Sequence, residues 1–152
     1  MEKKKKLYIG CSLTLLPVDK KDDFLRMTSE IKKELGKYFE VLEFKGMADL
    51  LTDHPLTPQQ IYDFDIKECV MKADCMLAFC DYPSLGLGYE MATCIEKQGI
   101  PVLAVAHKDA IVGRIIRGIG HKDFKFFYYN SEEEIIKKTL EIFLNEKISE
   151  QK

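Results

Sequence analysis

The stretch DCMLAFCDYPSLGLGYEMA, residues 74–92, decides the fold of this chain. Its first seven residues are almost continuously apolar, which is typical of a central strand in a parallel sheet covered on both faces. A proline and two glycines follow, and small apolar residues then begin a helix that Gly99 is expected to end. A buried strand, a short loop and a helix in this order predict one strand–helix crossover unit.

The same alternation runs through the rest of the chain. Strands are predicted at 6–10, 39–44, 74–80, 100–106 and 124–129, and helices at 22–35, from Thr57 to about Ala73, after the glycine-containing loop to about Gln98, and from Ser131 onward. Thr57 with Gln60 and Ser131 with Glu134 read as capping boxes. We therefore expect a single α/β domain over residues 1–152, a flavodoxin/Rossmann-like doubly wound sheet of about five parallel strands.

Composition restricts the function classes. The 152 residues carry a net charge of −2 and are 46% hydrophobic, which indicates one soluble domain and no basic surface for a nucleic-acid polymer or a membrane. There is no long apolar run and no recognisable signal peptide. The five cysteines form no C-x-x-C pair and do not cluster with the three histidines. We therefore expect no metal site, reduced thiols and a cytoplasmic location.

Two loops leave neighbouring strands at the carboxyl edge of the expected sheet, GCSLTLLP at 10–17 and DYPSLGLGYE at 81–90. Ligands of such sheets bind at this edge. Gly86 and Gly88 can adopt positive φ and expose backbone amides to an anion, and Ser84 adds a hydroxyl. Glu90, in the first helical turn, would be ionised there and could act as a nucleophile or stabilise a cationic sugar. The alternatives are a tight turn for the glycines and simple helix-end electrostatics for Glu90.

PSLGLGYE (83–90) resembles the signature of the nucleoside 2-deoxyribosyltransferase superfamily, most closely its branch of 2'-deoxynucleoside 5'-monophosphate N-glycosidases. LYIGCS (7–12), IYDFD with the later Ala73-Asp74, and IIRG (115–118) resemble further segments of that family. The resemblance implies an enzyme that hydrolyses the N-glycosidic bond of (deoxy)nucleoside 5'-monophosphates, works as a homodimer and needs no cofactor.

The resemblance also implies roles for single residues. Glu90 would attack the anomeric carbon, Tyr8 would orient Glu90, and Asp65 would help the base to leave. The 5'-phosphate would be held by Ser12, Ser84, Gly86, Gly88 and Arg117.

Two positions depart from the family pattern. Asp65 precedes Asp74 by nine residues, one more than in the family. One residue of slip rotates a helix position by about 100°, so either the helix has a local bulge or an earlier start, or Asp65 is not the equivalent residue and Asp63 takes its place. Relatives carry a serine at the position of Gly113 that touches the phosphate across the dimer, and Arg114 or Arg117 would replace that contact here.

Two other function classes stay open. A nucleoside 2-deoxyribosyltransferase on the same scaffold would pass the sugar to a second base, although Ser84 favours a phosphorylated substrate. A non-catalytic nucleotide-binding module would keep the glycine loop but would not need a carboxylate at position 90.

Overall fold

The computed structural model describes residues 2–43 and 56–145, which form a five-stranded parallel sheet. The strands are β1 (Lys6–Cys11), β2 (Glu40–Glu43), β3 (Cys75–Phe79), β4 (Val102–His107) and β5 (Phe124–Tyr129). Their order across the sheet is β2-β1-β3-β4-β5, and every neighbouring pair is parallel. The predicted α/β class, strand number and doubly wound topology are confirmed, with the strand order of the flavodoxin-like type.

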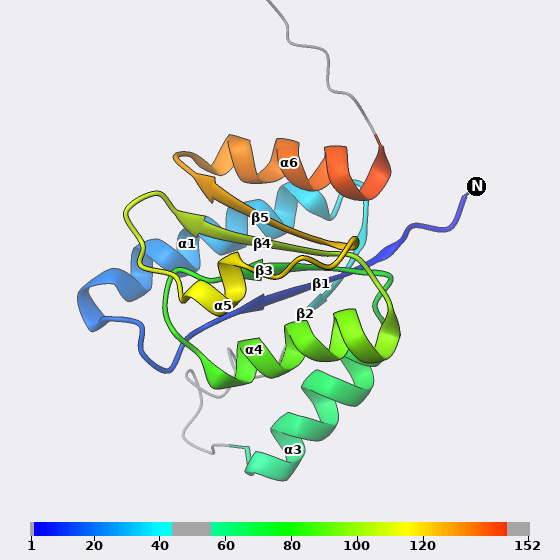
Figure 1. Ribbon diagram of the computed structural model, residues 1–152, viewed down its shortest axis with the longest axis horizontal. Helices are drawn as coiled ribbons and strands as arrows, with labels where there is room; N and C mark the ends of the chain where they lie inside the picture. Colours follow the sequence, from blue (N-terminus) through cyan, green and yellow to red (C-terminus); the bar gives the residue numbers. More distant parts are fainter. Residues whose placement is uncertain (1, 44–55, 146–152) are drawn as a thin grey trace, which may run out of the picture.

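Helices cover both faces of the sheet in three layers (Figure 1). α1 (Val18–Leu35) and α6 (Glu132–Leu144) pack together on one face. On the other face lie two longer helical runs: α3 (Pro58–Tyr62) continues into the π-helix η1 (Asp63–Cys69) and the 3-10 turn η2 (Val70–Lys72), and α4 (Leu85–Ala92) continues into η3 (Thr93–Gln98). The short α5 (Arg114–Arg117) precedes β5.

Helix ends follow mostly from local hydrogen bonds. Thr57 and Gln60 form the predicted capping box, with Oγ1 of Thr57 accepting from the Gln60 amide and Oε1 of Gln60 accepting from the Thr57 amide. Ser131 caps α6, but Oε2 of Glu134 accepts from the amide of Asn130, one residue earlier than a capping box requires. Gly99 ends η3 in the left-handed conformation with φ of 63°.

The helix predicted from residue 22 begins earlier, at Val18. Its first turn is exposed to solvent, with Val18 itself 90% exposed, so this turn adds no apolar periodicity to the sequence. Residues 44–55, between β2 and α3, lie outside the described part of the chain.

Each strand directs alternate side chains to opposite faces, so the molecule has two cores. Leu7 and Ile9 of β1 belong to the core under α1 and α6, whereas Tyr8 belongs to the core under α3 and α4. Strand β3 is buried along its whole length, as its apolar run predicted. Tyr8 therefore lies beneath the two helical runs that carry the candidate carboxylates.

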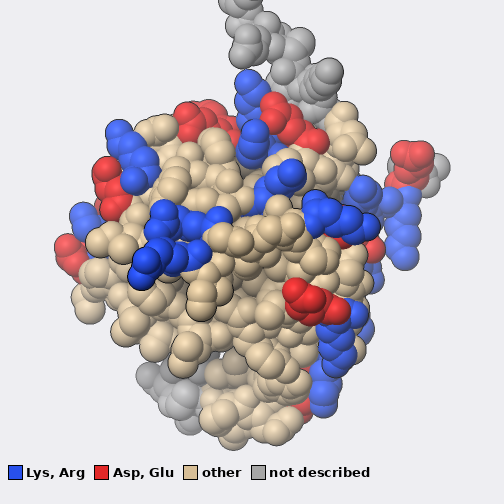
Figure 2. Space-filling model, in the orientation of Figure 1, with Lys and Arg blue, Asp and Glu red and all other residues tan. Residues whose placement is uncertain are grey.

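Positively and negatively charged side chains are distributed over several parts of the visible surface (Figure 2). The surface over the N-terminal half of α4 carries few of them. No helix among residues 2–43 and 56–145 combines the length and the apolar character needed to cross a membrane.

Candidate active site

The site forms where β1 and β3 end side by side. These strands are direct neighbours, with Cys11 paired to Phe79, so the loops that follow them meet at one edge of the sheet. Oγ of Ser12 donates a hydrogen bond of 3.0 Å to the carbonyl of Pro83 and joins the two loops. Ser12 is only 1% exposed, so the structure places its hydroxyl in this link between loops.

Tyr8 and Glu90 form the centre of the site. The phenol of Tyr8 donates a hydrogen bond of 2.9 Å to Oε1 of Glu90. Tyr8 comes from the buried middle of β1, and Glu90 is the sixth residue of α4. The sequence placed Glu90 in the first turn, but the helix begins at Leu85, so Glu90 lies in the second turn, where the helix dipole acts less strongly.

Burial controls the ionisation of both groups. It raises the pKa of Glu90 from its ordinary value of 4.5 to about 7, against the lowering effect of the Tyr8 hydrogen bond, and the negative charge of Asp65 raises it further. Burial therefore opposes the ionisation of Glu90 that the sequence led us to expect from the helix dipole. Burial first, and then the charges of Glu90 and Asp65, hold the pKa of Tyr8 well above its usual value, so Tyr8 stays a proton donor.

The extra residue before Asp74 is taken up in η1, a π-helix over Asp63–Cys69. A π-helical turn inserts one residue into a helix without breaking it. As a result Asp65 is buried, at 7% exposure, and its charge acts on Tyr8 and Glu90. Asp63 instead pairs with Lys67 at 2.6 Å and with Gln59 at 3.0 Å, and these partners lower its pKa. Of the two candidates, Asp65 is the one that is buried and whose charge acts on Glu90.

The glycine-containing loop is the start of α4. Ser84 is the N-cap, and its Oγ accepts a hydrogen bond of 3.1 Å from the amide of Leu87. Gly86 and Gly88 lie within the first helical turns, and neither has positive φ, contrary to the expectation. The amide of Gly88 donates to the carbonyl of Ser84, which is the first hydrogen bond within the helix. The amides of Leu85 and Gly86 come before it and have no carbonyl one turn earlier to which they could donate.

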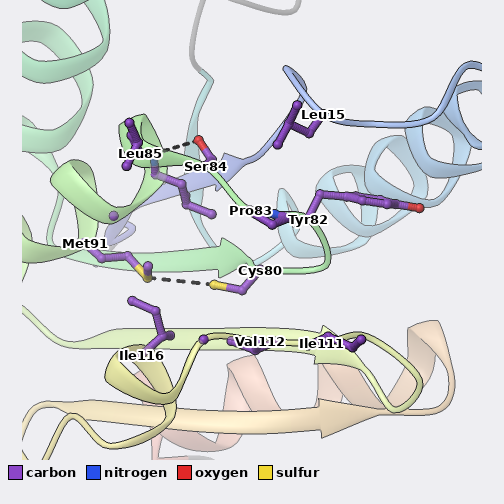
Figure 3. A pocket seen from close by; sticks show the side chains of 13 residues that line it. Leu15, Cys80, Tyr82, Pro83, Ser84, Leu85, Met91, Ile111, Val112 and Ile116 are labelled. Carbon is purple, nitrogen blue, oxygen red and sulfur yellow. Dashed lines mark hydrogen bonds between the residues drawn. The ribbon is translucent and has the colours of Figure 1, made fainter.

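A cleft of about 340 Å³ opens beside this helix start (Figure 3). It lies between the N-terminal half of α4 and the segment 111–116, and its wall is largely apolar. Ser84 and Gly88 line it, whereas Glu90 and Tyr8 are not among its described lining residues. Leu87 belongs to this lining, and its side chain also approaches Gly10 of β1, the strand residue next to the Glu90 carboxylate. The candidate reactive centre is therefore the Tyr8–Glu90 pair, and the cleft lies next to it.

The arginines predicted to replace the missing serine hydroxyl lie further out. Nε of Arg117 donates to the carbonyl of Val112 at 3.0 Å, and the residue is exposed. Gly113 lines the cleft, but neither Arg117 nor Arg114 is among its described lining residues. Within this chain the structure does not bring Arg117 together with Glu90 or Ser84.

One residue beside Glu90 was not singled out from the sequence. A Cβ atom on Gly10 of β1 would lie 3.0 Å from Oε2 of Glu90. A glycine inside a buried strand is the signal that could have drawn attention to it, since such glycines often mark a close approach. Within residues 2–43 and 56–145, no three His, Cys, Asp or Glu side chains are grouped so that they could hold a metal ion.

Comparison with known proteins gives the following similarities. No protein-family model matches the chain. A protein of Thermofilum pendens named "Putative 2'-deoxynucleoside 5'-phosphate N-hydrolase 1" is 32% identical over 114 residues, which cover 67% of this chain and 78% of that protein. A protein of the same name from Methanococcoides burtonii is 36% identical over 81 residues, or 53% of this chain and 61% of that protein.

Two solved structures share the fold. The CMP N-glycosidase BcmB of Clostridium botulinum superposes with a TM-score of 0.62 at 19% identity, covering 89% of this chain and 98% of BcmB. A 2-deoxyribosyltransferase from Bacillus psychrosaccharolyticus superposes with a TM-score of 0.60 at 14% identity, covering 86% of this chain and 90% of that enzyme.

Proposed function

The chain belongs to the 2'-deoxynucleoside 5'-phosphate N-hydrolases of the nucleoside 2-deoxyribosyltransferase superfamily, and from this membership we propose that it hydrolyses (deoxy)nucleoside 5'-monophosphates to free base and (deoxy)ribose 5-phosphate. The observation that carries the proposal is the Tyr8–Glu90 hydrogen bond, with buried Asp65 beside it at the carboxyl edge of β1. An oriented carboxylate and a second buried carboxyl group suit the cleavage of a bond to an anomeric carbon.

In the proposed mechanism the ionised carboxylate of Glu90 attacks the anomeric carbon. A new carbon–oxygen bond forms, the carbon–nitrogen bond breaks, and the base leaves with its electron pair. The base gains a proton from water held on the Asp65 side of the site. A second water molecule then attacks the anomeric carbon of the glycosyl ester, and its proton replaces the one that the base took, which releases the sugar phosphate and restores Glu90. Tyr8 keeps the carboxylate oriented through this cycle.

The start of α4 would hold the 5'-phosphate. The hydroxyl of Ser84 uses a lone pair to accept from Leu87, so its proton remains available for donation to a phosphate oxygen. The unpaired amides of Leu85 and Gly86, together with the positive end of the helix, favour a dianion at the same place. Gly88 would contribute space, because a Cβ atom there would meet no atom within 4 Å.

We also propose a homodimer in which a second copy covers the surface around the cleft. Leu85 is 97% exposed and Ile111 is 92% exposed, and both line the cleft together with Leu15. Ile115 is also exposed, and charged side chains are few over the N-terminal half of α4 (Figure 2). An exposed apolar area of this kind favours a subunit interface. Light scattering at micromolar concentration should therefore give a dimer, and Ile111→Asp should give a monomer with reduced activity; an active wild-type monomer would refute the dimer.

The five cysteines are all free thiols, which supports a proposed cytoplasmic location because reduced thiols are usual there.

Incubation with a panel of nucleosides and their 5'-monophosphates, followed by chromatography, tests the activity. Release of base from monophosphates, in wild type and not in Glu90→Gln, is the expected result. Exchange of the base when a second free base is added would instead identify a transferase. Binding without any turnover would identify a non-catalytic module.

A further inference from the structure

Gly10 occupies a position in β1 where a larger residue is expected. It is buried, and it pairs with Ala78 of the central strand β3. Buried strand positions favour β-branched and other large apolar side chains. Glycine weakens a strand interior because it loses more conformational freedom on folding and adds nothing to the packing.

The backbone conformation does not account for this glycine. Among the glycines in the described part of the chain, Gly99 alone has positive φ. The space around Gly10 does account for it: a Cβ atom there would lie 2.9 Å from Cε of Met76, 3.0 Å from Oε2 of Glu90 and 3.1 Å from Cδ1 of Leu87. The contact with Met76 is shorter than real Cβ atoms make, and those with Glu90 and Leu87 are tight enough that each group would have to shift by a few tenths of an ångström.

Strand alternation places Tyr8 and Gly10 on the same face of β1. Tyr8 donates to Oε1 of Glu90, while the missing side chain of Gly10 leaves room for Oε2. We propose that Gly10 is a positioning residue for the Glu90 carboxylate, which lies directly on the strand backbone because no Cβ atom intervenes. This inference rests on the proposed function for its catalytic consequence, although the geometric part can be tested without turnover.

Gly10→Ala should disturb the carboxylate more than the fold. Cε of Met76 and Cδ1 of Leu87 are the ends of flexible side chains that can rotate away. The carboxylate of Glu90 is held by its hydrogen bond from Tyr8, so we expect a shift away from the new methyl group to lengthen that bond. At the start of α4 only the side-chain end of Leu87 has to move, and the Ser84 hydroxyl and the backbone amides stay in place, so the binding of a phosphorylated substrate should change little.

The experiment compares wild type, Gly10→Ala and Gly120→Ala. Gly120 is a matched control, because a Cβ atom there would meet no atom within 4 Å and its φ is not positive. For a 5'-monophosphate that the wild type hydrolyses, kcat of Gly10→Ala should fall roughly ten- to a hundred-fold, as small misplacements of reacting groups do, with KM changed less than about twofold. Gly120→Ala should retain wild-type kinetics.

A carbon-13 NMR titration of the Glu90 carboxyl group, assigned by comparison with Glu90→Gln, provides a readout that needs no activity. The midpoint should rise by about one pH unit in Gly10→Ala, because the Tyr8 hydrogen bond that favours ionisation is weakened. An unchanged midpoint together with unchanged kcat would overturn the inference. If the wild type proves inactive, the proposed function fails, but the titration still decides the geometry.

Loss of folding in Gly10→Ala would be resolved by Gly10→Ala/Glu90→Ala. Recovery of folding in the double variant supports the inference, because the clash that prevents folding is then the one between the new methyl group and the Glu90 carboxylate. A double variant that remains unfolded assigns Gly10 to packing against Met76 and Leu87 and overturns it.

Discussion

Replacing Glu90 by Gln should make the protein more stable at alkaline pH, even though it removes the proposed nucleophile. Burial raises the pKa of Glu90 from 4.5 to about 7 in the folded protein, so the folded protein binds this proton more tightly than the unfolded chain does. Below the unfolded pKa both states are protonated and the group contributes nothing. As the pH rises towards the folded pKa, the unfolded chain loses its proton first and stability falls. Above the folded pKa the full penalty is present.

The size of this penalty follows from the shift. Each pKa unit corresponds to about 1.4 kcal/mol, so the shift of Glu90 amounts to about 3 kcal/mol at alkaline pH. Between about pH 5 and about pH 8.5, the stability of Glu90→Gln relative to wild type should therefore grow by about 2–3 kcal/mol. For a chain of this size, that corresponds to a relative rise in Tm of roughly 5–10 °C.

Urea unfolding at a series of pH values measures the difference directly. Any constant cost of the amide group cancels, because only the change with pH is compared. Glu96→Gln is the matched control: Glu96 is an exposed carboxylate in the same helical run, and the same charge is removed. A Glu90→Gln difference that stays flat with pH, or that parallels Glu96→Gln, would refute the reasoning that Glu90 is destabilised by burial.

Three further variants test the other groups of the site. Asp65→Asn should lower kcat and move the acid limb of the kcat/KM profile to lower pH, because the charge of Asp65 raises the pKa of Glu90. Asp63→Asn is the control and should leave kcat and the acid limb nearly unchanged, since Asp63 pairs with Lys67. Equal effects of the two variants would contradict the assignment of Asp65. Tyr8→Phe should move the same limb upward and reduce kcat/KM at neutral pH by roughly ten- to a hundred-fold, because a hydrogen bond to a charged group contributes about 1.5–3 kcal/mol, and an unmoved limb would count against that bond. Ser84→Ala should reduce turnover of monophosphates by a similar factor and barely affect nucleosides, and an equal loss for both would refute the phosphate site.

The fold could be predicted from the sequence because its main signals are local. The apolar run of β3, the Thr57 capping box and the left-handed Gly99 each depend on a few neighbouring residues, and the structure contains all three. The first turn of α1 could not be predicted in this way. It begins at Val18 in solvent and leaves no apolar pattern.

The site could be predicted only in part. The motif pointed to Glu90 and Tyr8, and the structure joins them by a hydrogen bond. The predicted conformation of Gly86 and Gly88 is wrong, because Ser84 caps the helix before either glycine. The third helical position holds no Glu or Gln that would have marked this helix start in the sequence. The choice between Asp63 and Asp65 depended on a π-helix, which the spacing of residues along the sequence does not indicate.

The ionisation of Glu90 links stability to the proposed chemistry. The half-buried carboxylate of Glu90 beside β1 is poorly solvated before the reaction, and Tyr8 offsets only part of that cost. When the bond to the base breaks, positive charge develops on the sugar directly beside the carboxylate. An opposite charge at this distance favours the ionised form, so the destabilisation present in the free enzyme is relieved in the transition state. Interactions that improve on going to the transition state are the ones that accelerate the chemical step. In the proposed mechanism, the burial that lowers the stability of the folded protein would thus also make Glu90 an effective partner for a cationic sugar.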